Sequence, residues 1–274
     1  MTHKTKFSIV QVREESCAPR TKRLPRRKTR FSLTQQRMPD RTHELFTYLE
    51  TYLQSRVPGC RLEKTQLPQA PELSLCLINE DYPRDALTRE QALALMDRPP
   101  YWGFCWASGQ VLGHCVLENP DWVKGRTLVD FGAGSGVVGI AAKMAGARRV
   151  ILCDLDEEAI LAGELNARIN GVMVDFSSAL DDLLEEDVSQ WMITAADVFY
   201  DRDNLAVLET LLDRFSTVLV SDSRLKGQAL QGMDMIGAYD SHTVPDLDES
   251  CEFNRVTLYR SRLNRSVSPS PLSR

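Results

Sequence analysis

The stretch LVDFGAGSGVVGIAA places an acid and a series of glycines directly after an apolar run. A glycine loop at such a point lets the backbone approach a ligand that a β-carbon would repel. Two registers are open. Gly134, Gly136 and Gly139 fit G-x-G-x-x-G, the dinucleotide fingerprint, in which a pyrophosphate sits on a helix N-terminus. Gly132, Gly134 and Gly136 fit G-x-G-x-G, preceded by Asp130.

The carboxylate of Asp130 favours the second register. A carboxylate at the end of a strand is poorly matched to a pyrophosphate, but it suits a ligand that carries an ammonium and a sulfonium, as S-adenosylmethionine does. We therefore predict that Asp130, Gly132, Ala133, Gly134 and Gly136 bind this cofactor. A nicotinamide-dependent oxidoreductase is the competing class. It would need a further catalytic domain, for which the chain leaves little room after this loop.

A second acid ends the next predicted strand, in the sequence CDLD. Asp154 stands where a carboxylate can bind both ribose hydroxyls of a nucleoside. Leu155 belongs to the same predicted cofactor site, and Ser177, after the third strand, is a predicted adenine contact. Asp156 fits better as the N-cap of the following helix, and an N-cap role is also the alternative for Asp154.

These acids and glycines require strands that end at one edge of a sheet. From about residue 104, strand-like and helix-like segments alternate, which predicts a parallel sheet with helices on both faces. The predicted strands are 126–131, 148–153, 172–176, 191–196 and 216–221. The predicted helices are 106–118, 136–146, 156–170, 179–186 and 203–214. Two more strand-like runs, 237–244 and 253–260, predict a terminal antiparallel hairpin with a short acidic loop.

Four regions follow from composition and pattern. We predict a disordered basic arm at 1–37, an extension at 38–100, the α/β domain at 101–262 and a disordered tail at 263–274. Inside the extension, helices are expected at 41–55 and 88–97, with a strand at 72–78. The arm has three open explanations: a transit peptide, a basic tail for an anionic partner, or a start upstream of a true beginning at Met38.

Charge and cysteine content narrow the function classes. The net charge of the 274-residue chain is −5, although residues 1–41 carry twelve Lys or Arg against three acids. The folded body is therefore acidic, which argues against a nucleic-acid surface. Seven scattered cysteines without a C-x-x-C pair or metal-ligand spacing indicate reduced thiols and no metal. No apolar run is long enough for a membrane span. We expect a cytoplasmic protein, or a mitochondrial matrix protein if the arm is a transit peptide.

The order VDFGAGSG…CDLD, with an antiparallel ending, closely resembles the class I, seven-strand S-adenosylmethionine-dependent methyltransferases over about residues 100–260. The resemblance implies a Rossmann-like, doubly wound sheet of seven strands, mostly parallel, with helices on both faces. It also implies S-adenosylmethionine as the cofactor. A non-catalytic scaffold of the same fold is disfavoured by the intact acids and glycines.

In that class, the residues after the fourth strand face the transferred methyl group. Here they are ADVFYDRD, a D-x-x-Y form without the prolines of the (N/D)-P-P-(Y/F) motif of base and amide methylators. This form resembles the protein-lysine branch and disfavours a nucleic-acid methyltransferase. The resemblance implies that Asp197 binds and aims the incoming lysine, while Phe199 and Tyr200 offer aromatic faces to a cation. The alternative for the aromatic pair is a loop plug over the core.

Upstream, PPYWGFCWASGQVLGHCVLENPDWVKG closely resembles a segment of the electron-transfer-flavoprotein β-subunit lysine methyltransferases, as do GIAAKMAGARRV and DVFYD. The chain departs from that family in its basic N-terminus and in WAS, where Trp-Pro-Gly is expected. The resemblance implies a protein substrate, either that β subunit or a similar protein, with ribosomal-protein methyltransferases as the nearest relatives. It places Trp106 and Ser108 over the methionine end of the cofactor, with plain apolar packing as the alternative for Trp106.

Overall fold

The computed structural model describes residues 38–82, 88, 99–199, 202–225, 228–247, 249–250 and 253–262. Its main feature is a seven-stranded sheet with the order β5-β4-β3-β6-β7-β9-β8. The strands are β3 (Thr127–Phe131), β4 (Arg149–Cys153), β5 (Asp175–Ser177), β6 (Met192–Ala196), β7 (Thr217–Asp222), β8 (Met233–Asp240) and β9 (Arg255–Ser261). Strands β3 to β7 are parallel, and β9 is antiparallel to both of its neighbours. The predicted doubly wound sheet with an antiparallel ending is confirmed.

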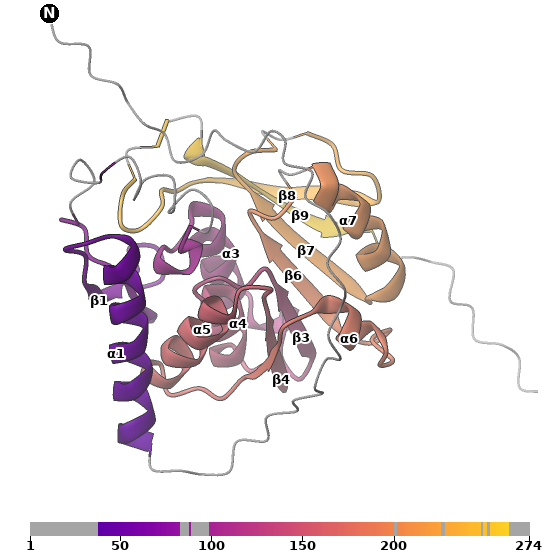
Figure 1. The fold of residues 1–274 in the computed structure, drawn as a ribbon. Coiled ribbons are helices and arrows are strands. Elements are labelled where there is room, and N and C mark those ends of the chain that lie inside the picture. The colour runs from indigo at the N-terminus through magenta and orange to yellow at the C-terminus, as the bar shows by residue number, and fades with distance from the viewer. Residues whose placement is uncertain are drawn as a thin grey trace, which may run out of the picture.

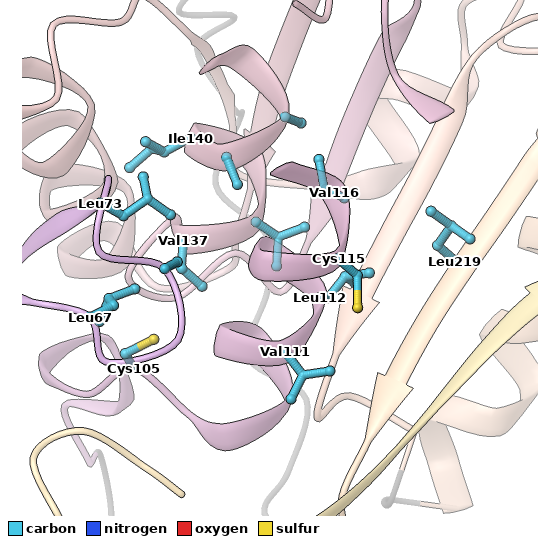
Figure 2. Packing of buried hydrophobic residues seen from close by; sticks show 14 of the residues in the cluster. Leu67, Leu73, Cys105, Val111, Leu112, Cys115, Val116, Val137, Ile140 and Leu219 are labelled. Carbon is cyan, nitrogen blue, oxygen red and sulfur yellow. The ribbon is translucent and has the colours of Figure 1, made fainter. Parts of the chain in front are cut away.

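Helices cover both faces of the sheet (Figure 1). One face carries α3 (Ala107–Glu118), α4 (Val137–Met144) and α5 (Glu157–Ile169), and the other carries α6 (Leu180–Leu184) and α7 (Arg202–Arg214). Successive strand residues point to opposite faces, so Leu128 joins the first core cluster and Val129 the second. Figure 2 shows the first cluster, in which side chains of α3 and α4 pack together near Leu219 of β7. Burial on both faces explains why the parallel strands β3, β4, β6 and β7 are mostly apolar.

The N-terminal part forms an additional layer on α5. Helix α1 (Met38–Arg56) lies alongside α5 in Figure 1, and β1 (Leu62–Gln66) pairs antiparallel with β2 (Ser74–Ile78) in a separate two-stranded sheet. Leu45, Leu49 and Leu53 recur every four residues, so they share one face of α1 and are all buried. Arg41 of α1 also forms an ion pair with Glu164 of α5, with 3.1 Å between Nη2 and Oε2.

Most predicted elements agree with the structure to within a few residues, but three details differ. Strand β5 is shorter than the predicted strand 172–176 and starts at Asp175, because pairing with β4 covers only Asp175–Ser177. Strand β8 runs over Met233–Asp240 rather than 237–244, so the loop before β9 is longer than predicted. Strand β1 was not predicted, because LEKTQ has few apolar residues and pairs only with β2.

Several predictions fall on residues outside the described ranges. These are the basic arm, the C-terminal tail and the helix at 88–97, of which only residue 88 is described. Within the described part of the chain, no helix combines the length and apolar character needed to cross a membrane. The cysteines described there, Cys60, Cys76, Cys105, Cys115 and Cys153, are buried free thiols.

Candidate active site

The sequence-predicted acids meet at the carboxyl edge of the parallel strands. Phe131 at the end of β3 pairs in register with Cys153 of β4 and Ala195 of β6. The loops that follow these strands therefore leave the sheet side by side, carrying the glycine loop, Asp154 and Asp197. In doubly wound sheets, ligands bind outside this edge, where neighbouring connections turn to opposite faces.

The glycine loop adopts the G-x-G-x-G register. Gly132, Gly134 and Gly136 have φ angles of +68°, +52° and +79°, in the left-handed region that favours glycine. Gly139 instead lies inside α4, where a β-carbon would come within 2.3 Å of Leu152, so it serves helix–sheet packing. A β-carbon on Gly134 would meet no atom within 4 Å, which leaves the backbone open to a ligand at that point.

The loop is tied directly to the end of β4. The amides of Gly132 and Ala133 donate to the carbonyl of Cys153, at 2.9 and 3.2 Å. The amide of Gly134 donates to Oδ2 of Asp154 at 2.8 Å. The two predicted halves of the cofactor site are therefore one hydrogen-bonded unit.

Asp154 directly follows β4, and binding of a ribose by its carboxylate stays a prediction. Its Oδ1 accepts a hydrogen bond from the amide of Asp156 at 3.0 Å, and burial raises its pKa above the usual value. Asp156 itself caps α5 by accepting from the amide of Glu158, which confirms its predicted role. Leu155 is 83% exposed, so an apolar side chain stands free beside Asp154 and can cover a flat aromatic ligand.

Ser177 also reaches this edge, because it pairs in register with Cys153 just before Asp154. Its hydroxyl donates to the carbonyl of Ala179 at 2.9 Å. The side chain is therefore engaged in its own turn, and an adenine contact by Ser177 stays a prediction.

Asp130 differs from its prediction. It is buried under the glycine loop, where Oδ2 accepts from the amide of Gly139 and Oδ1 accepts from the hydroxyl of Thr194, both at 2.9 Å. Burial raises the pKa of Asp130 to about 7. Both oxygens thus bind the protein itself, joining β3, β6 and α4. The expectation of a carboxylate that faces the cofactor's ammonium is corrected to one that supports the loop from beneath.

Asp197 is held in an unusual conformation directly after β6. Its φ of +52° makes it the single described non-glycine residue in the left-handed region, a conformation that costs free energy. Three donors converge on Oδ1: the hydroxyl of Ser108 at 2.7 Å, the amide of Ser223 at 3.1 Å and the hydroxyl of Ser223 at 3.0 Å. No described residue donates to Oδ2. The three donors therefore fix the position of Oδ1.

The contact with Asp197 corrects the prediction for Ser108. We expected Ser108 to cover the methionine end of the cofactor, but the side chain is completely buried and its hydroxyl donates to Asp197. Its carbonyl accepts from the hydroxyl of Ser221 at 2.6 Å, which pins the first turn of α3 to β7. Ser108 therefore orients a neighbouring site residue.

The two predicted aromatic residues after Asp197 have different outcomes. Phe199 is completely buried in the second core cluster, with side chains of β6, β7 and α7. Phe199 therefore plugs the core, as in the alternative given for the aromatic pair. Its predicted role toward the transferred methyl group is withdrawn. Tyr200 lies outside the described residues.

Trp106 directly precedes α3, two residues before Ser108, and belongs to an aromatic group. Its ring centroid lies 5.7 Å from that of Tyr101 and 5.9 Å from that of Phe104. Its Nε1 donates to the carbonyl of Tyr101 at 3.0 Å. Tyr101 is 45% exposed, so this group presents an aromatic surface near the start of α3. Contact between Trp106 and a cofactor stays a prediction.

Three residues that matter to this site were not found from the sequence. Ser223 and Asp222 follow β7, and their relation to Asp197 depends on β6 and β7 being neighbours. Asn166 of α5 is completely buried; its Nδ2 donates to the carbonyl of Ser135 in the glycine loop, and its Oδ1 accepts from the amide of Cys76 in β2. The one signal for Asn166 in the sequence was its place as a polar residue in the apolar stripe of a predicted helix.

The residues at this edge fit S-adenosylmethionine. Gly134 leaves an open approach for a ligand, Asp154 can accept from hydroxyls, and Leu155 offers an apolar surface. In the part of the chain that the structure describes, no group of three His, Cys, Asp or Glu side chains could hold a metal ion.

Comparison with known proteins agrees with this arrangement. The family model described as "Ribosomal protein L11 methyltransferase (PrmA)" matches residues 115–221. A human protein named "Electron transfer flavoprotein beta subunit lysine methyltransferase" is 36% identical over 134 residues, which are 48% of this chain and 50% of that protein. A Caenorhabditis elegans protein named as a homolog of that enzyme is 34% identical over 171 residues, covering 56% of this chain and 69% of that protein.

Among solved structures, a ribosomal protein L11 methylase from Lactobacillus delbrueckii subsp. bulgaricus is 23% identical, with a TM-score of 0.43. The match covers 57% of this chain and 78% of that one. The chain spans between 50% and 60% of the length of the human and mouse relatives.

The sheet order, the glycine loop and the family match define a class I methyltransferase with a Rossmann-like fold. Within that class, the chain belongs to the family of the electron transfer flavoprotein β subunit lysine methyltransferases.

Proposed function

We propose that this chain is an S-adenosylmethionine-dependent protein-lysine N-methyltransferase, acting on the electron transfer flavoprotein β subunit or a similar protein. The observation that carries the proposal is the state of Asp197, with Oδ1 held by three donors and Oδ2 without a described partner. It lies at the same sheet edge as Asp154 and the open glycine loop. The names of the relatives support the choice of substrate.

When bound, S-adenosylmethionine supplies a methyl group activated on a sulfonium. The acceptor amine must be neutral to displace it, and a lysine with a pKa of about 10.4 requires about 4.6 kcal/mol to lose its proton at pH 7. A carboxylate beside the amine favours the ammonium, so Asp197 is badly suited to be a strong base. Its role is to bind and aim the nucleophile through Oδ2, to which no described residue donates. Such positioning is the main source of rate in a displacement reaction.

The test is methylation of purified electron transfer flavoprotein β subunit with labelled S-adenosylmethionine, followed by identification of the modified residue. We expect label on lysine, and loss of most transfer in Asp197→Ala with the cofactor still bound. Asp197→Asn should transfer methyl groups faster than Asp197→Ala if the shape of the side chain dominates. The two variants should be equally slow if its charge dominates. Tight NAD(H) binding without S-adenosylmethionine binding would overturn the proposal.

A ribosomal protein is the second candidate substrate, because the matching family model describes a ribosomal protein L11 methyltransferase. Purified L11 belongs in the same assay. Label on L11 and none on the flavoprotein subunit would reassign the substrate while leaving the reaction class intact.

A further inference from the structure

A second carboxylate lies beside Asp197 and has no place in the reaction described so far. Asp222 is the last residue of β7, and because Ala196 pairs with Ser221, Asp197 and Asp222 leave two parallel strands at the same level. Asp222 is completely buried. Its Oδ1 accepts from the amides of Arg224 at 2.7 Å and Leu225 at 2.8 Å. Its Oδ2 is buried and has no hydrogen-bond partner among the described residues.

A buried carboxylate oxygen without a partner is costly, so its retention calls for a reason. The hydrogen bonds to Oδ1 close the turn that follows β7. Ser223 lies in that turn and donates twice to Oδ1 of Asp197. Asp222 is therefore linked structurally to Asp197 through Ser223.

The charge of Asp222 also reaches Asp197. Burial, followed by repulsion from Asp197, raises the pKa of Asp222 to about 7, while the Arg224 guanidinium opposes this rise. Arg224 also forms an ion pair with Glu249, at 3.1 Å, which partly offsets the positive charge that Asp222 experiences. Burial raises the pKa of Tyr259 in β9, and the charge of Asp222 adds to this rise. The buried α7 side chains that share the second core cluster with Tyr259, namely Leu208 and Leu211, are apolar.

We propose that Asp222 is a positioning residue for methyl transfer, which holds Ser223 against Asp197 and sets the negative potential that Asp197 presents to a cationic reactant. This inference rests on the proposed function. It makes the site selective for cations, namely the sulfonium of the cofactor and the ammonium of a substrate lysine. Because Asp222 gains its charge near neutral pH, that selectivity grows as the pH rises.

The effect of the Asp222 charge on a cationic ligand can be measured with two ligands that differ in the charge on sulfur. S-adenosylmethionine carries a charged sulfonium, whereas S-adenosylhomocysteine carries a neutral sulfur and is otherwise alike. The ratio of their dissociation constants, measured by calorimetry from pH 6 to pH 8.5, reports the potential at the sulfur. In the wild-type chain, we expect the preference for S-adenosylmethionine to increase on the order of 10-fold over this range, the effect of one added charge roughly 12 Å from the sulfur at an effective dielectric constant of about 20.

Asp222→Asn is the main variant, because its side-chain carbonyl can still accept from the amides of Arg224 and Leu225. It should keep binding both ligands, with a lower preference for the charged one that no longer changes with pH. Asp187→Asn is the control. Asp187 is exposed and its pKa is lowered, so removal of its charge should leave the pH dependence of the ratio in place.

Each outcome decides something. A ratio that is independent of pH in the wild-type chain overturns the inference, whether or not any variant folds. A pH dependence that survives in Asp222→Asn also overturns it. Failure of both ligands to bind would instead refute the proposed function. Ser223→Ala separates the two parts of the role, because it should slow methyl transfer while leaving the pH dependence of the ratio in place.

Discussion

Replacing Asp130 by Asn should make the protein more stable, and more so at higher pH. Asp130 is buried, and its two oxygens accept hydrogen bonds from the amide of Gly139 and the hydroxyl of Thr194. An asparagine can preserve both contacts: its carbonyl accepts from Gly139 and its amide donates to the Thr194 oxygen. The hydroxyl of Thr194 keeps the carbonyl of Val129 as an acceptor, at 3.3 Å. The substitution therefore removes a buried charge without leaving a polar group unpaired.

The size of the effect follows from the pKa of Asp130. The folded value is about 7, against 3.8 for an ordinary aspartate, because burial disfavours the charged form. Between these values the folded chain binds more protons than the unfolded chain, so the free energy of unfolding falls as the pH rises. One group contributes at most about 1.4 kcal/mol per pH unit, and the full shift corresponds to about 4 kcal/mol above pH 8. Asp130→Asn should recover most of this amount at pH 8 and little at pH 4.

Urea unfolding of the chain without ligand at several pH values between 5 and 8 measures this directly. The wild-type free energy of unfolding should fall across the range, and Asp130→Asn should reduce the slope. Part of the slope should remain, because the pKa of Asp222 is also about 7. Asp187→Asn is a suitable control: Asp187 is exposed and its pKa is lowered, so it does not titrate in this window. Equal slopes for wild type and Asp130→Asn would refute the reasoning.

The same variant tests the corrected role of Asp130. If the carboxylate supports the glycine loop from beneath, Asp130→Asn should keep its affinity for S-adenosylmethionine within a few-fold. If its charge acted directly on the cofactor's ammonium, loss of a charge-assisted hydrogen bond would weaken binding by about 10-fold or more. Calorimetry at pH 8, where the wild-type carboxylate is ionised, distinguishes the two.

Further substitutions probe the rest of the site. Asp154→Ala should weaken cofactor binding at least about 100-fold, because two charge-assisted hydrogen bonds to ribose contribute about 1.5–3 kcal/mol each; calorimetry showing normal affinity would remove Asp154 from the site. Ser108→Ala should slow single-turnover methyl transfer by about 10-fold or more through the lost contact with Asp197, with cofactor affinity unchanged. Asn166→Ala should cost about 2–5 kcal/mol in urea unfolding, because it leaves the buried carbonyl of Ser135 and the amide of Cys76 unpaired, and a loss below 1 kcal/mol would contradict that account.

The elements that depend on local pattern were predictable. The alternation of apolar runs and helical segments reflects a sheet buried on both faces, so the strands that carry Asp130 and Asp154 were found within a residue or two. The N-cap role of Asp156 needs only its own backbone and the next two residues. The left-handed glycines likewise follow from a tight turn between a strand and a helix.

Burial was the main property that sequence could not assign. Phe199 and Leu155 are both apolar residues next to a site acid, yet one is completely buried and the other is 83% exposed. The difference depends on whether a helix covers that end of the sheet, since α7 packs in the same cluster as Phe199. Asp130 and Asp154 likewise lie near the carboxyl ends of neighbouring strands, Asp130 inside β3 and Asp154 directly after β4, but the glycine loop folds over Asp130 and leaves Asp154 beside it.

The surroundings of Asp197 show why this part of the site needed three dimensions. Its partners come from α3 and from the turn after β7, which are separated along the chain by more than one hundred residues. They meet because β6 and β7 are adjacent and because Ser221 ties the first turn of α3 to β7. A left-handed aspartate is strained, and three donors on one oxygen are a sufficient reason for it to persist. The strain is thus met by contacts that also fix the carboxylate, so the machinery that aims a nucleophile is built into the packing of α3 on the sheet.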